Sequence, residues 1–113
     1  MDFFKYTINE DEWTIYLIDD DDMVISDEDT AADTDFSKKE LYFRKGDLAL
    51  NIVMHELWHV YFGYCYLTDT SELSLSDMEE ISAALFSDKG IRMIDRSKDM
   101  YNKLLELRES HGQ

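Results

Sequence analysis

Residues 47–64 read DLALNIVMHELWHVYFGY, and this stretch decides the fold. Its apolar residues recur at the three- and four-residue spacings of an α-helix, and they cover most of the helix circumference. Asp47 suits the N-cap position, and Gly63 lies close to the expected end. The pattern predicts a central, buried helix that runs from Asp47 to about Tyr64.

The residues before this helix have the composition of strands. Four short segments are rich in aromatic and β-branched residues, and they span residues 3–8, 13–18, 23–26 and 40–44. Trp13, Ile15 and Leu17 alternate onto one face of the second segment. The four aspartates at 19–22 lack the spacing and the glycine of a calcium-binding loop, so they predict a charged turn that closes a hairpin. Residues 27–35 are polar and acidic and predict a loop.

The residues after the central helix predict two further helices. Ser76 and Glu79 fit a capping box that begins the first of these helices, and Gly90 is expected to end it. The second extends from about Arg96 to Glu109. The expected inward residues are Met78, Ile81, Leu85, Met100, Leu104 and Leu107. Strands over residues 1–45 and helices over residues 47–109 predict one α+β domain, with a small antiparallel sheet packed on the central helix.

Composition excludes some classes of function. The chain has 113 residues, with 26 acidic and 11 basic side chains and a net charge of −15. A protein that binds nucleic acid through its phosphates needs a basic surface, so we expect no direct nucleic-acid binding. No apolar run is long enough for a membrane span, and the N-terminus lacks the order of a signal peptide. With Cys65 as the single cysteine, we expect a reducing, cytoplasmic setting.

The chemistry of the predicted central helix lies in His55, Glu56 and His59. Residues four apart lie on one helix face, so both imidazoles can bind the same ion. Zinc is the ion that this pair of ligands indicates. Glu56 is adjacent to the pair and can act as a base toward a water molecule. We therefore predict that His55 and His59 bind Zn²⁺.

The order of strands, HExxH helix and later glutamate-bearing helix resembles the core of the zincin metallopeptidases. The spacing is similar to that of the thermolysin-like branch, because Glu79 follows His59 by twenty residues and begins the run Glu-Glu-Ile-Ser. This resemblance covers roughly residues 40–88. It implies Glu79 as the third zinc ligand, Glu56 as the catalytic base and residues 40–44 as the edge strand beside the cleft. Helix periodicity alone does not separate Glu79 from Glu80, and Asp77 is a third possibility.

The chain also departs from that family. Met78 and Ala83 stand where the family usually has an asparagine before the glutamate and an aspartate after it. An oxyanion needs a hydrogen-bond donor, and only Tyr101 and His111 are available farther along the chain. The sequence therefore indicates a scaffold that can bind zinc with an incomplete catalytic set.

Two functions follow from the sequence. The small, very acidic chain with an incomplete catalytic set is similar in character to phage-encoded type II anti-CRISPR proteins, which bind Cas9 and block its handling of nucleic acid. That resemblance implies a protein partner with a basic surface, such as the nucleic-acid channel of Cas9. The alternative is a minimal zinc metallopeptidase that uses Glu56 as its general base. On sequence alone we favour the binding protein.

Overall fold

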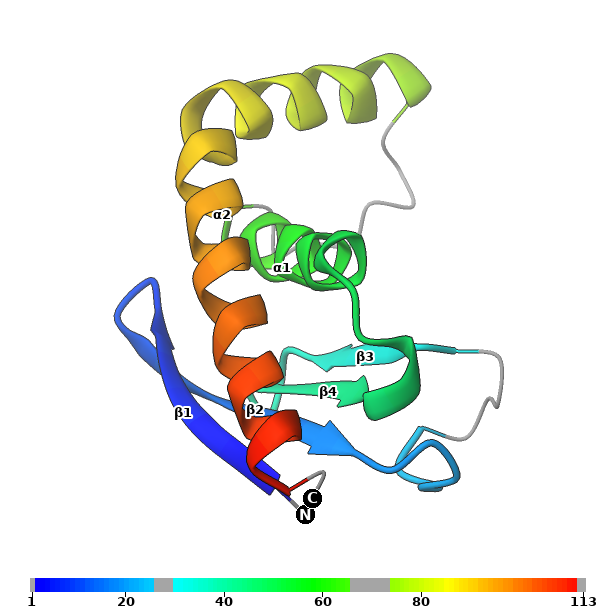
Figure 1. Ribbon diagram of the computed structural model, residues 1–113. Coiled ribbons are helices and arrows are strands. Elements are labelled where there is room, and N and C mark those ends of the chain that lie inside the picture. The colour runs from blue at the N-terminus through cyan, green and yellow to red at the C-terminus, as the bar shows by residue number, and fades with distance from the viewer. Residues whose placement is uncertain (1, 26–29, 66–73, 112–113) are drawn as a thin grey trace.

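The structure is a computed structural model that describes residues 2–25, 30–65 and 74–111 (Figure 1). It has an α+β fold, as the sequence predicts. Its elements in chain order are β1 (Asp2–Ile8), β2 (Asp11–Ile18), β3 (Ala32–Asp35), β4 (Glu40–Arg44), the short 3-10 helix η1 (Lys45–Asp47), α1 (Leu50–Cys65) and α2 (Leu75–His111). None of the described helices is both long enough and apolar enough to cross a membrane.

The four strands form one sheet in the order β1-β2-β4-β3. β1 pairs antiparallel with β2, and β3 pairs antiparallel with β4, but β2 and β4 are parallel. The sheet is therefore mixed, and the expectation of a purely antiparallel sheet is wrong. The expectation that residues 40–44 form the edge strand is also wrong, since β4 lies between β2 and β3. The edge strands are β1 and β3, and β3 lies in the segment expected to be a loop.

The hairpin of the structure joins β1 to β2, whereas the sequence predicts a hairpin between residues 13–18 and 23–26. β1 and β2 are joined by a two-residue turn at Asn9 and Glu10, whose φ angles are 51° and 71°. Positive φ at both positions is the geometry that closes a tight hairpin between twisted strands. The expected returning strand at residues 23–26 is not formed, because residues 23–25 are turn and bend and residue 26 lies outside the described residues.

The predicted aspartate turn is confirmed, and Arg44 organises it. The backbone nitrogen of Asp22 donates to the carbonyl of Asp19 at 3.1 Å, which closes the turn. Arg44 is 3% exposed, and its guanidinium donates to the backbone carbonyls of Asp20, Asp22, Ile25 and Thr30. A buried cation is stable only when its donors are satisfied, and these carbonyls satisfy them. The aspartate side chains at positions 19–21 are left exposed.

The core lies between the sheet and the two helices. Trp13, Ile15 and Leu17 of β2 are at most 1% exposed, which confirms their predicted common face. They belong to one apolar cluster with residues of α1 and α2, including the predicted inward residues Met100 and Leu104. Figure 1 shows both helices on the same side of the sheet.

α1 begins three residues later than predicted. The backbone nitrogens of Ile52 and Val53 both donate to the carbonyl of Ala49, and Asp47 belongs to η1. The helix is also less buried than its apolar content suggests. Asn51, His55 and His59 are exposed and follow one another at intervals of four residues. α1 therefore packs its apolar face into the core and keeps one polar stripe open, and that stripe carries the histidines.

The two helices expected after α1 form one continuous helix, α2. Its capping residues are Ser74 and Asp77, since the Asp77 nitrogen donates to Ser74 Oγ at 3.0 Å, so the expected cap at Ser76 is wrong. Figure 1 shows α2 bending sharply part-way along its length. Ser87 Oγ donates to the carbonyl of Ala84 at 3.1 Å, and Gly90 follows within one turn. Serine and glycine together commonly bend a helix. The prediction that Gly90 ends a helix is wrong, because α2 continues through this residue.

Candidate zinc site

The exposed stripe of α1 brings two imidazoles together. The Nε2 atoms of His55 and His59 are 3.2 Å apart, and their ring centroids are 4.8 Å apart with an interplanar angle of 77°. The His55 side chain is 67% exposed. Both rings thus direct the same nitrogen to one point above the helix surface, where a ligand from solvent can reach them.

This arrangement fits a zinc ion. With Zn–N bonds of 2.0–2.1 Å and tetrahedral angles, two histidine nitrogens lie about 3.3 Å apart. The observed 3.2 Å agrees with this spacing. A hydrogen bond between a protonated and an unprotonated ring nitrogen gives a similar distance, so the spacing is compatible with both a bound metal ion and a direct bond between the rings.

Glu56 lies behind the pair, at the edge of the core. Its side chain is 9% exposed, and its Oε2 atom is 3.9 Å from His55 Nε2. Its other carboxylate oxygen, Oε1, accepts a hydrogen bond of 2.6 Å from Thr34 Oγ1. One oxygen is therefore held by the protein, and the other points toward the histidine that the sequence predicts as a ligand.

Thr34 comes from β3, which positions this bond. β3 contacts α1, and Thr34 pairs with Leu41 of β4, whose side chain is fully buried. Because alternate residues of a strand share a face, Thr34 lies on the helix-facing side together with Ala32. Sequence reasoning missed Thr34 because it lies in an acidic segment expected to be a loop, 22 residues before its partner.

The predicted third ligand is not assembled with the histidines. Asp77, Glu79 and Glu80 are all exposed in the first turns of α2. Over residues 2–25, 30–65 and 74–111, no three histidine, cysteine or acidic side chains are grouped so that they could hold a metal ion. The choice between Glu79 and Glu80 stays a prediction. The side chains of Cys65 and His111 lie outside the described residues.

Aromatic side chains lie beside the pair. Trp58, which precedes His59, has its ring centroid 6.3 Å from that of Phe86 on α2. Phe86 is 57% exposed. This contact joins the face of α1 next to the histidines to the part of α2 that follows Glu79 and Glu80.

The comparisons with known proteins identify no relative, since no protein-family model, no curated protein and no solved structure matches this chain.

Proposed function

We propose that this chain binds zinc through His55 and His59 and hydrolyses peptide bonds. The observation that supports this most is the position of Glu56, which has one carboxylate oxygen held by Thr34 and the other 3.9 Å from His55 Nε2. The sequence alone favours a binding protein. The placement of Glu56 between an exposed histidine pair and β3 favours the enzyme instead.

Each residue has a distinct role in this proposal. A bound zinc ion would supply Lewis acidity toward a water molecule and a peptide carbonyl. His55 and His59 would hold the ion, and Glu79 or Glu80 would complete its ligands. Glu56 would accept a proton at Oε2 and later release it, because a base next to the reacting water serves both steps. Thr34 would keep the carboxylate from rotating away.

Substituting Glu56 separates catalysis from metal binding. The purified chain, supplied with one equivalent of zinc, would be incubated with fluorescein-labelled casein as the probe. We expect slow cleavage by the wild type and a loss of at least about 100-fold in Glu56→Gln, in line with general-base catalysis. Glu106→Gln, an exposed charge on α2, is the matched control and should keep full activity.

Zinc content must be measured on the same samples. If Glu56→Gln keeps its zinc and loses cleavage, the proposed role of Glu56 is supported. If the wild type binds zinc but cleaves no better than Glu56→Gln, the peptidase proposal is wrong. Glu79→Ala and Glu80→Ala, compared for zinc affinity, then identify the third ligand.

A second candidate is a cytoplasmic inhibitor that binds a basic protein surface such as that of Cas9. The aspartate turn supports this candidate, because Arg44 holds its backbone from inside and the side chains at positions 19–21 are exposed. Asp19 also pairs with Lys45 at 3.0 Å, and Asp20 accepts a hydrogen bond from the Gly46 nitrogen at 2.7 Å. Such a preordered anionic surface can dock against arginine- and lysine-lined walls, and the zinc would then stabilise the fold.

The inhibitor is tested by reversing the charges of that turn. Replacing Asp19, Asp20 and Asp21 with lysine should weaken binding to guide-loaded Cas9, measured by biolayer interferometry, and the loss should shrink as salt rises. Glu56→Gln should bind as tightly as the wild type. Absence of binding by the wild type, or binding insensitive to the reversal, would rule out this candidate.

A further inference from the structure

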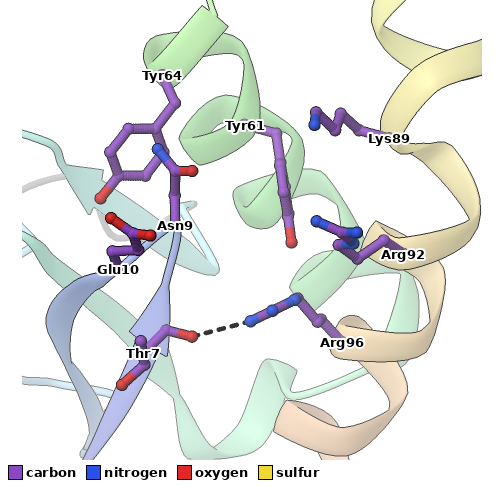
Figure 2. A pocket seen from close by; sticks show the side chains of 8 residues that line it. All are labelled: Thr7, Asn9, Glu10, Tyr61, Tyr64, Lys89, Arg92 and Arg96. Atoms are coloured by element: carbon purple, nitrogen blue, oxygen red, sulfur yellow. Dashed lines mark hydrogen bonds between the residues drawn. The ribbon is translucent and has the colours of Figure 1, made fainter.

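A basic pocket lies on this acidic chain, away from the histidines. Lys89, Arg92 and Arg96 of α2 line one wall of a cavity of about 520 Å³ (Figure 2). The opposite wall is formed by the β1–β2 turn, and the end of α1 lies between them. Tyr61 is two residues after His59, which places it about 200° around α1 from that histidine. The pocket is thus separate from the candidate zinc site.

The cations of this wall retain unused hydrogen-bond donors. Arg96 donates through Nη1 to the backbone carbonyl of Thr7 at 2.9 Å, which fixes its guanidinium and leaves its other N–H groups available. Among the described residues, Lys89 forms an ion pair with Asp88 at 3.4 Å. Arg92 makes no hydrogen bond or ion pair with any residue that the structure describes. Lys89, Arg92 and Arg96 therefore present N–H donors on one wall of the pocket, and an anion can accept hydrogen bonds from them.

Tyr61 adds a hydrogen-bond donor to the pocket, and its hydroxyl is open to the pocket, because no fully buried side-chain oxygen or nitrogen of the described residues lacks a partner. It is only 6% exposed, and Figure 2 shows its hydroxyl pointing into the pocket toward Arg92 and Arg96. Within the described part of the chain this hydroxyl has no hydrogen-bond partner. Burial raises the pKa of Tyr61, and the two arginines oppose the rise. The phenol remains protonated at neutral pH and can donate to an anion.

The far wall of the pocket carries an amide and a carboxylate instead of cations. Asn9 and Glu10, the two turn residues with positive φ, place an amide and a carboxylate on it. A carboxylate repels a second anionic group but accepts hydrogen bonds from hydroxyl or amino groups. The pocket therefore suits a ligand with one anionic end and one neutral polar end. Its volume lies within the range of small-molecule sites.

We propose that this pocket binds a small organic phosphate, with its phosphate against Arg92, Arg96 and Tyr61 and its hydroxyl-bearing part against Asn9 and Glu10. Phosphate suits a wall of guanidinium groups because its oxygens accept paired N–H bonds. Charges beyond about 8 Å are screened at physiological salt, so the net charge of −15 acts on the pocket mainly through its near acidic groups. These are Glu10 on the far wall and Asp88, Asp95 and Asp99, which line the neighbouring hollow with Arg92 and Arg96. A sugar phosphate and a nucleoside monophosphate share this chemistry.

Calorimetric titration of the full chain at physiological salt tests the proposal. The probes are ribose 5-phosphate, AMP, inorganic phosphate, adenosine and acetate. We expect one or both organic phosphates to bind more tightly than inorganic phosphate, and no binding of adenosine or acetate. Ribose 5-phosphate and AMP distinguish a sugar phosphate from a nucleotide. Acetate binding as tight as that of the phosphates, or no phosphate binding at all, would overturn the assignment.

Matched variants locate the binding in the pocket. Arg92→Gln should weaken binding at least about tenfold, because it removes charge-assisted hydrogen bonds. Lys98→Gln removes one exposed cation from α2 outside the pocket and should change affinity less than about twofold. Tyr61→Phe keeps the buried ring and should also weaken binding. Equal losses in Arg92→Gln and Lys98→Gln would show a general charge effect and refute the site.

Discussion

Replacing Thr34 with valine removes a hydroxyl and keeps the side-chain shape, so it tests the bond that holds Glu56. Thr34 Oγ1 donates to Glu56 Oε1 at 2.6 Å, and the Glu56 side chain is 9% exposed. A hydrogen bond to a charged group contributes about 1.5–3 kcal/mol, and its loss leaves a buried acceptor without this donor. We expect Thr34→Val to lower the free energy of unfolding by about 2 kcal/mol.

Urea unfolding at neutral pH measures this effect. Trp13 is fully buried, so tryptophan fluorescence reports the loss of the core. With an m-value of about 1–3 kcal/mol/M, the expected change lowers the midpoint by roughly 1 M. Thr34→Ser keeps the hydroxyl and should lose less than half as much. Thr7→Val, an exposed threonine on β1, should stay within about 0.5 kcal/mol of the wild type.

If the free energy of unfolding of Thr34→Val lies within about 0.5 kcal/mol of that of the wild type, the hydrogen bond from Thr34 to Glu56 does not stabilise the fold as we propose. A double substitution with Glu56→Leu, which removes the acceptor altogether, adds a second criterion. If the bond joins these two side chains, the combined loss differs from the sum of the single losses by more than about 0.5 kcal/mol. Strict additivity would show that the two residues do not interact.

Three other predictions follow from the fold. Arg44→Met should lower the free energy of unfolding by about 3 kcal/mol, because four carbonyls around the aspartate turn lose a buried donor; urea unfolding within about 1 kcal/mol of the wild type would contradict this. Gly63→Ala should cost about 1–3 kcal/mol, because the added Cβ lies 2.6 Å from the Phe36 ring; an unchanged melting temperature in calorimetry would argue against that packing. Burial and a hydrogen bond to Asp11 raise the pKa of Tyr64 to about 12. The unfolded chain loses this proton from about pH 10, so stability should fall between about pH 10 and 12. Tyr64→Phe should make that fall shallower, and an identical pH slope in urea unfolding would disprove the assignment.

The sequence predicts a helix or strand correctly where the spacing of its own apolar residues requires that structure. The apolar spacing of residues 47–64 gave α1 to within three residues at its start, and the alternation of Trp13, Ile15 and Leu17 gave β2 and its buried face. In both cases burial of the apolar residues requires the predicted structure, so the sequence pattern carries the information.

The errors occur where distant contacts override local preference. Ala32–Asp35 has an acidic composition but becomes an edge strand, β3, through pairing with β4. Glu10 takes a positive φ that usually favours glycine or asparagine, so Asn9 is the one residue that indicates the β1–β2 turn. Gly90 would end many helices, yet it is buried and α2 continues through it.

The same contrast holds within the candidate site. The pair His55 and His59 could be predicted because helical spacing alone brings the rings together. Thr34 could not, since its contact with Glu56 depends on how β3 packs against α1. A third ligand from α2 would depend on where the first turns of α2 lie relative to α1, and residue spacing does not determine that.

Zinc titration of the metal-stripped protein tests directly whether His55 and His59 bind a zinc ion. Isothermal calorimetry would compare the wild type with His59→Ala and with His111→Ala, which removes the histidine outside the pair. We expect the wild type and His111→Ala to bind one zinc ion each, and His59→Ala to bind zinc at least about 100-fold more weakly, because a direct ligand is lost. No zinc binding by the wild type, or equal losses in the two variants, would contradict it.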